Sequence, residues 1–279
     1  MADFTKTLAL LACKDADARR SAMESALQLA GLTYTVQCEA ESSKKLRPAQ
    51  NFLVKTGDAA QPCILFCAHY DAQPGSLGAN DNAAAVCILL ALARTLAAEG
   101  TTAEFAFFDA EESGRDGSRL YVRELDKSSV TGVVNLDLCG YGDTIVILDK
   151  GHAKKRALQP FCSKEMMQKH TAQLVKYLPE SDDASFRGTQ LPSMSLAIVP
   201  RWDIQYLNAL STYGGGFLGR PPEFEMMIGQ MEVTTTMHGG FRDTLESVQP
   251  EAMQRVYEYL LEASCLMAKQ PQKRHLFAR

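Results

Sequence analysis

Hydrophobic and polar positions alternate along the chain in segments that predict an α/β fold. Short apolar runs predict strands at residues 32–39, 51–55, 63–68, 103–108, 132–136, 144–148 and 193–199. Apolar residues at helical spacing predict helices at 15–30, 81–98, 117–125, 158–177, 202–210 and 250–267. Strands and helices alternate, and no linker or repeat divides the chain. We therefore expect residues 1–279 to form a single three-layer α/β/α domain with a mostly parallel, mixed central sheet.

Two segments depart from this regular alternation. Residues 179–191 are polar and are expected to form a loop. Residues 211–233 contain three consecutive glycines and a pair of prolines, so a long loop is expected there as well. Loops of this length tend to be functional or mobile, but the sequence does not distinguish a cover for a cleft from a contact with a partner.

The composition is that of an ordinary globular protein and excludes several function classes. Of 279 residues, 46% are hydrophobic and 22% are charged, and the formal net charge is -4. The basic residues are scattered, so no nucleic acid is expected as a partner. No uninterrupted apolar run approaches the ~18 residues of a membrane span, so no membrane contact is expected. The start lacks a convincing signal peptide and the eight cysteines form no CxxC pair, which favours a cytoplasmic location with reduced thiols.

The stretch at residues 63–81 carries the first concentration of chemically active side chains. The strand predicted at 63–68 is apolar on both faces, as in a central strand covered on both sides, and it ends at His69 and Asp71. A loop with glycines follows, and Asp81 then begins the predicted helix. In open α/β sheets ligands bind beyond the carboxyl ends of the strands, so these side chains lie where a site is expected.

Later segments add further polar groups at equivalent places. Glu111 and Glu112 follow the strand predicted at 103–108, Asp137 follows the strand at 132–136, and His238 follows the long loop. Acidic groups gathered at one sheet edge would repel one another without a cation. Histidine and carboxylate together are the ligand mix of borderline divalent metals, zinc first.

Taken singly, each of these residues has a simpler explanation. His69 and Asp71 could form a local hydrogen-bonded pair, and Asp81 alone is a typical helix N-cap. Glu111 and Glu112 could be a solvated acidic pair, while Asp137 and His238 could be ordinary turn residues. Their shared placement at one sheet edge favours a metal site over these readings.

The ordered motifs resemble a known family. They are His69-Tyr70-Asp71, Gly78-Ala79-Asn80-Asp81-Asn82, Ala110-Glu111-Glu112-Ser113-Gly114 with Gly117-Ser118, Asn135-Leu136-Asp137, and His238 with Asp243-Thr244. Together they are similar to the zinc-dependent exopeptidases of the bacterial leucyl aminopeptidase type, which also include glutamate carboxypeptidases and glutaminyl cyclases. The resemblance covers residues 63–248.

The resemblance implies a role for each matched residue. Asp81 would bridge two zinc ions, with His69 and Asp137 completing one site and Glu112 and His238 completing the other. Glu111 would be the general base, and Asp71 would hold the ring of His69. Cobalt or manganese could replace zinc. The implied function is removal of N-terminal residues from a peptide substrate.

One motif departs from the family pattern and leaves specificity open. Family members often carry Ser-Asp-His before a phenylalanine, whereas this chain has Ser181-Asp182-Asp183-Ala184-Ser185-Phe186. A carboxypeptidase would need an arginine for the substrate carboxylate, and the candidates are Arg187, Arg201, Arg220 and Arg242. A glutaminyl cyclase would need indole rings in its pocket, and Trp202 is the single tryptophan. A binding domain with a relict metal site would have lost a ligand or Glu111, and none is lost.

Overall fold

The computed structural model describes residues 2–39, 47–148, 151, 154–213 and 221–268. The strands are β1 (Thr35–Cys38), β2 (Gln50–Thr56), β3 (Cys63–His69), β4 (Ala103–Phe108), β5 (Val130–Leu136), β6 (Thr144–Leu148), β7 (Ala172–Val175) and β8 (Ser193–Val199). The α-helices are α1 (Thr5–Leu11), α2 (Ala16–Leu29), α3 (Ala84–Ala98), α4 (Asp116–Glu124), α5 (Lys164–Lys169), α6 (Asp203–Leu210), α7 (Pro222–Gln230) and α8 (Pro250–Ala268). Shorter helical turns are η1 (Ala79–Ala83), η2 (Asp182–Phe186), η3 (Ser211–Tyr213) and η4 (Val233–Thr236).

The strands form one mixed sheet, as the sequence predicted. Their order is β1-β2-β4-β3-β5-β8-β6-β7, and the central strands β4, β3, β5 and β8 run parallel to one another. The antiparallel pairs are β1 with β2, β2 with β4, and β6 with β8. Because the four central strands run parallel, their carboxyl ends lie at one edge of the sheet.

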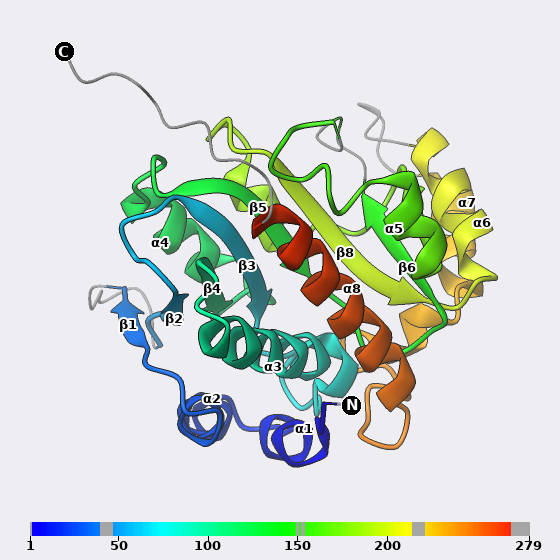
Figure 1. Cartoon of the computed structure of the whole chain (residues 1–279). Helices are drawn as coiled ribbons and strands as arrows, with labels where there is room; N and C mark the ends of the chain where they lie inside the picture. The colour runs from blue at the N-terminus through cyan, green and yellow to red at the C-terminus, as the bar shows by residue number, and fades with distance from the viewer. Residues whose placement is uncertain (1, 40–46, 149–150, 152–153, 214–220, 269–279) are drawn as a thin grey trace.

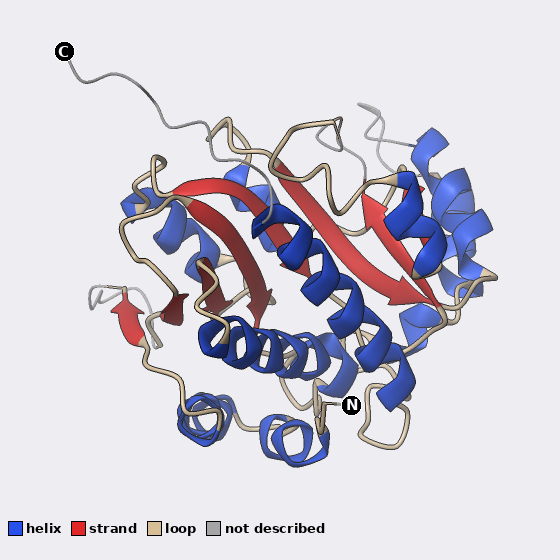
Figure 2. Ribbon diagram, viewed as in Figure 1, coloured by secondary structure: helices blue, strands red, loops and turns tan. Residues whose placement is uncertain are grey.

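Helices cover both faces of this sheet (Figures 1 and 2), which confirms the α/β/α prediction. On one face, Ile64 and Phe66 of β3 lie in a large apolar core with α3 and α8. On the other face, Leu65 and Cys67 pack with Tyr121 of α4. Alternate residues of β3 therefore enter different cores, as the period-2 geometry of a strand requires.

The segment Ala79–Ala98 is the one described helical stretch long and apolar enough to cross a membrane by composition. In the fold, 72% of its most apolar window is buried inside the protein, and α3 packs against α8 and the sheet. Its apolar character is thus explained by its central position in the core.

The helix predicted at 158–177 is the largest departure from expectation. Only α5 is helical there, and it is followed by the strand β7. Thr171 has a φ of 54°, which interrupts the helix, and β7 then pairs with β6 along the sheet. The segment that the apolar pattern predicts as one helix is therefore a short helix followed by an edge strand.

The prediction of a long loop at 211–233 is also partly wrong. Residues 214–220 lie outside the described residues, but α7 begins directly afterwards, and Pro222 stands in its first turn. A proline there loses no hydrogen bond because the first N–H groups of a helix are unpaired. Phe224 anchors α7 in an apolar cluster with α6.

Smaller corrections concern the chain start, the first strand and the main helix. α1 was not predicted, and β1 is mostly exposed rather than half-buried. The regular helix begins at Ala84, because residues 79–83 form the wider turn η1 instead.

None of the eight cysteines, all of which lie in the described ranges, forms a disulfide. The cytoplasmic location stays a prediction.

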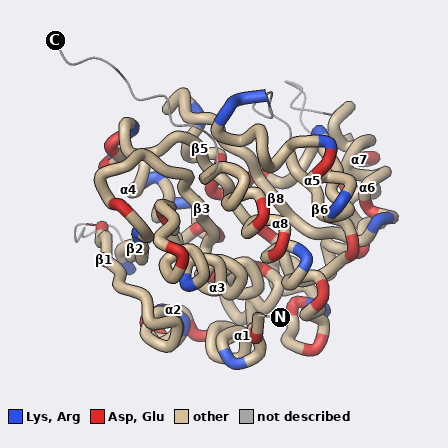
Figure 3. Tube along the Cα trace, viewed as in Figure 1, with Lys and Arg blue, Asp and Glu red and all other residues tan. Residues whose placement is uncertain are grey.

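Basic and acidic positions are interspersed along the Cα trace in Figure 3, without a basic stripe among the residues described there.

Candidate metal centre

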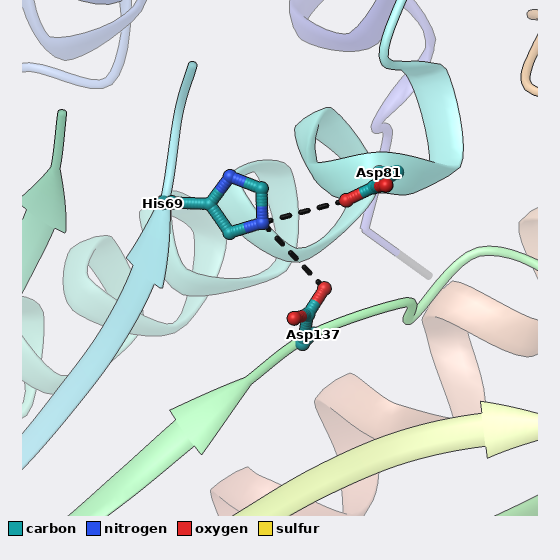
Figure 4. A group of neighbouring side chains, drawn as sticks. All are labelled: His69, Asp81 and Asp137. Atoms are coloured by element: carbon teal, nitrogen blue, oxygen red, sulfur yellow. Dashed lines mark ion pairs between the residues drawn. The ribbon is translucent and has the colours of Figure 1, made fainter. Parts of the chain in front are cut away.

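Three predicted ligands meet at the carboxyl edge of the sheet (Figure 4). His69 ends β3, Asp81 lies in η1, and Asp137 directly follows β5. His69 Nε2 lies 3.4 Å from Asp81 Oδ1 and 3.6 Å from Asp137 Oδ1. One ligand atom from each residue lies within 4.8 Å of the other two, a spacing that suits a single metal ion.

The two other predicted ligands, Glu112 and His238, lie outside this group of three. Oε2 of Glu112 is 4.0 Å from Nε2 of His238. The backbone N–H of His238 donates to Oδ2 of Asp81 at 2.7 Å. Asp81 thus contacts one residue of each pair, His69 through Oδ1 and the backbone of His238 through Oδ2.

The residues present fit a divalent cation. Asp137 Oδ1 and Glu112 Oε1 are buried and accept no hydrogen bond from the described part of the chain. Buried carboxylate oxygens without partners are costly, and a cation would satisfy both. Two imidazoles and three carboxylates form a nitrogen and oxygen donor set that suits zinc.

Asp243 fixes the turn that carries Asp81. Its Oδ1 accepts the backbone N–H groups of Asn80 at 2.9 Å and Asp81 at 3.2 Å, and its Oδ2 accepts the hydroxyl of Ser76 at 2.6 Å. Asp243 belongs to the last motif of the resemblance, but no role for it followed from the sequence. Only a three-dimensional contact shows that it supports a segment some 160 residues away.

Asp71 connects His69 with the loop that carries the two glutamates. Nδ1 of His69 lies 3.3 Å from the backbone carbonyl oxygen of Asp71, its hydrogen-bond partner, and also 3.3 Å from the carboxylate oxygen Oδ1. The same carboxylate accepts the backbone N–H groups of Glu111 at 3.0 Å and Glu112 at 3.1 Å. One buried side chain thus orients an imidazole and a loop together.

The electrostatics of the cluster shift several protonation equilibria. Burial raises the pKa of Glu111 to about 8; the charge of His69 opposes this shift, and that of Asp182 adds to it. Burial and Asp81 raise the pKa of Glu112 to about 7. Burial alone would lower the pKa of His69, but the neighbouring carboxylates of Asp137, Asp71 and Asp81 raise it well above its usual value. A carboxyl group poised near neutral pH is suited to proton transfer.

A cavity opens beside these groups. Its volume is about 540 Å³ including its mouth, and its polar lining includes His69, Asp81, Glu111, Asp137 and His238. Its apolar lining consists of Leu138, Leu178, Pro179, Leu196, Ala197 and Met237. The polar groups lie together on one part of a mainly apolar cavity, as in many small-molecule sites.

Two further polar groups near this cavity were not predicted from the sequence. Ser195 lines the cavity, and its buried hydroxyl has no hydrogen-bond partner among the described residues. Asp182 is fully buried, and burial raises its pKa to about 7. Asp182 belongs to the loop that departs from the family pattern, so that departure was the available signal.

Of the four arginines considered for a carboxypeptidase, the three described ones are paired with glutamates or exposed. Arg187 pairs with Glu180 at 2.6 Å, and Arg242 pairs with Glu232. Arg201 is exposed, and Arg220 lies outside the described residues. Trp202 is 74% exposed and does not line the cavity.

Known proteins similar to this chain include several aminopeptidases. The chain is 30% identical over 191 residues to the probable lipoprotein aminopeptidase LpqL of Mycobacterium tuberculosis, an alignment that covers 62% of this chain and 37% of that protein. The curated relatives are longer, and the alignments cover from 13% to 37% of their lengths.

Solved structures share the fold at low sequence identity. A leucine aminopeptidase precursor from Bacteroides thetaiotaomicron superposes with a TM-score of 0.68 at 16% identity, covering 96% of this chain and 98% of that one. A glutaminyl cyclase from Porphyromonas gingivalis superposes with a TM-score of 0.66 at 16% identity, covering 94% and 95%. Peptidase family M28 matches residues 51–264. Since this match spans well over half of the chain, the protein belongs to peptidase family M28.

Proposed function

We propose that this chain is a metal-dependent aminopeptidase that removes N-terminal residues from peptides. The observation that carries the proposal is the meeting of His69, Asp81 and Asp137 beside a cavity that Glu111 also lines. Membership of family M28 supports peptide bond hydrolysis. The Mycobacterium relative named an aminopeptidase supports action at the N-terminus.

In this proposal the chain holds two zinc ions. His69 and Asp137 hold one ion, Glu112 and His238 hold the other, and Asp81 is shared between them. When bound, the ions would activate a water molecule and polarise the scissile carbonyl. Through the contacts described above, Asp71 would fix the position of the His69 ring relative to the Glu111–Glu112 loop.

Glu111 acts as the general base in the proposed reaction. Its carboxylate takes a proton from the attacking water and delivers it to the departing amine. Glu111 and Glu112 divide the work, because one keeps its carboxylate free while the other is a ligand. The apolar part of the cavity excludes water around the scissile bond, which strengthens the electrostatic interactions there.

The test is hydrolysis of aminoacyl-anilides by the full chain loaded with zinc. The expected result is release of the aniline from substrates with a free α-amino group, and no release from N-acetylated ones. Inactivity of the zinc-loaded protein on a broad panel would contradict the proposal. Cleavage of N-acetylated peptides only when their C-terminus is free would indicate a carboxypeptidase. Cyclisation of a peptide with an N-terminal glutamine would indicate a glutaminyl cyclase.

A further inference from the structure

Helix α2 lies outside the segment that matches the family, yet two of its side chains reach the loops of the metal centre. They are the neighbouring residues Arg19 and Arg20. We propose that these arginines are positioning residues, with Arg19 setting the loop that carries Asp81 and Arg20 setting the loop that carries Glu111. The inference rests on the proposed function, because it assigns these two loops to catalysis.

Arg19 is an unusually buried cation. It is 2% exposed, and no other lysine or arginine within the described ranges is buried. Its Nη2 donates to the backbone carbonyl of Cys13 at 2.7 Å and to that of Leu77. The buried charge is thus held by backbone carbonyls and by the field of nearby carboxylates, those of Asp71, Asp243 and Asp81. A charge buried in this way is costly unless its surroundings stabilise it.

The contact with Leu77 fixes the turn that leads to Asp81. Gly78 follows with a φ of 53°, and a Cβ on this residue would lie 2.8 Å from Nη2 of Arg19 and 2.7 Å from the carbonyl oxygen of Asp81. The guanidinium group, the glycine and the Asp81 backbone are therefore in close contact. A shift of Arg19 would move the turn and, with it, the carboxylate of Asp81.

Arg20 acts on the neighbouring loop through Asp109. Its Nη2 donates to Oδ2 of Asp109 at 2.6 Å, and Asp109 is completely buried at the end of β4. The other carboxylate oxygen accepts the backbone N–H of Ala110 at 3.0 Å. Ala110 has a φ of 58°, which is uncommon for a residue with a side chain, and Glu111 comes next. Asp109 has two further partners, because Nη1 of Arg47 donates to Oδ1 at 3.3 Å and the backbone N–H of Gln50 donates to Oδ2 at 3.2 Å. The contact with Arg20 is the shortest of the three, so it helps most to hold the backbone conformation that places Glu111 at the cavity.

The test compares Arg19→Met and Arg20→Met in the full chain. Zinc affinity is measured by competition with a chelator, and kcat and KM are measured on an aminoacyl-anilide. We expect Arg19→Met to weaken zinc binding about 10-fold or more, since displaced supports of metal ligands cost roughly 10- to 100-fold. We expect Arg20→Met to lower kcat roughly 10- to 100-fold with KM within about twofold, since a small misplacement of a base has such effects. Zinc affinity should fall less than in Arg19→Met, because Glu112 lies on the same loop but Asp81 does not.

Leu27→Ala is the matched control. Leu27 is buried on the same helix, and the substitution weakens the packing of α2 without touching either loop. It should lower the melting temperature and leave zinc affinity and kcat unchanged when measured well below that temperature. If Leu27→Ala reproduces the losses of the arginine variants, α2 contributes only to general stability and the proposal is wrong.

Arg19→Lys and Arg20→Lys serve if a methionine variant does not fold. Each keeps the positive charge but loses the guanidinium fork, so we expect a change of about threefold in the same direction. Wild-type zinc affinity and kcat in both lysine variants would overturn the proposal. The zinc measurement on the Arg19 variants needs no turnover. It therefore tests the role proposed for Arg19 even if the protein is inactive on peptides.

Discussion

The backbone N–H of His238 donates a 2.7 Å hydrogen bond to Oδ2 of Asp81, although 157 positions separate the two residues along the chain. The bond ties the segment after α7 to the turn before α3. The imidazole of His238 lies near Glu112, with 4.0 Å between Nε2 and Oε2. Asp81 is therefore the residue on which both halves of the proposed two-metal site depend.

The shared role of Asp81 predicts unequal effects of ligand substitutions on metal content. Asp81→Ala should remove most of the bound metal, whereas Glu112→Gln should reduce the content from about two ions to about one. Zinc per chain, measured by mass spectrometry after dialysis, distinguishes the cases. Equal metal loss in the two variants would show that Asp81 is not shared.

Glu111→Gln should separate proton transfer from metal binding. Without a proton acceptor, kcat should fall by roughly 10²- to 10⁴-fold, the usual contribution of general base catalysis. Zinc affinity should stay within about threefold of the wild-type value, because the proposed ligand set is intact. Steady-state kinetics with a chelator competition give both numbers. Retained activity would mean that another group is the base.

The raised pKa values of Glu111 and Glu112 predict how stability depends on pH in the metal-free protein. Both lie above the ordinary value of 4.5, at about 8 and about 7, so the native state binds more protons than the unfolded state between these limits. The free energy of unfolding should therefore fall as pH rises from about 4.5 to about 8. His69, whose pKa is raised too, adds stability at low pH that is lost in the same direction.

Urea denaturation of the metal-free protein at several pH values measures this slope. Glu111→Gln should make the slope shallower, because one of the shifted groups is gone. Zinc must displace these protons, so zinc affinity should rise with pH over the same range. Calorimetry in buffers of different ionisation enthalpy would detect the released protons. A stability that rises with pH would contradict the assignment.

Asp71→Asn should disturb both structures that this carboxylate joins. The amide keeps one acceptor oxygen and loses the other, so a backbone N–H of Glu111 or Glu112 would be left unpaired. We expect a loss of about 1–3 kcal/mol in stability, the usual cost of an unsatisfied buried group. Activity should fall roughly 10- to 100-fold as His69 loses its support. Asp58→Asn, at an exposed turn, is the control and should change neither quantity.

Gly78→Ala and Gly75→Ala form a matched pair. Both glycines have positive φ, but a Cβ at Gly78 would lie 2.5 Å from the Cβ of Ala72, whereas nothing lies within 4 Å of one at Gly75. Gly75→Ala should therefore cost about 1 kcal/mol of backbone strain, and Gly78→Ala should cost more, about 3 kcal/mol. Only Gly78→Ala should weaken zinc binding. Chemical denaturation and zinc competition on the two variants check these expectations.

The sequence by itself determined the central strands and the polar groups at their ends. β3, β4 and β5 are largely buried on both faces, so their apolar runs are continuous and easily recognised. Because parallel strands share an edge, the apolar runs alone lead one to expect His69 and Asp137 close together. Local periodicity was a sufficient signal in these segments.

Hydrophobic periodicity predicted the wrong secondary structure where tertiary contacts determine it. The pattern at 158–177 indicates a helix, but pairing with β6 makes β7 a strand. α7 was not predicted because the glycines and prolines around it indicated a loop. In these segments, tertiary contacts outweigh the weak intrinsic preference of the chain.

Only the tertiary structure decided how the site is supported. Asp243 beneath Asp81, and Arg19 and Arg20 behind the two loops, act through hydrogen bonds to groups remote in sequence. Such contacts leave no periodic trace, because a hydrogen bond depends on where two segments meet and not on the spacing within either one. The sequence therefore identified the chemical groups at the sheet edge, while the fold determined which groups hold them in place.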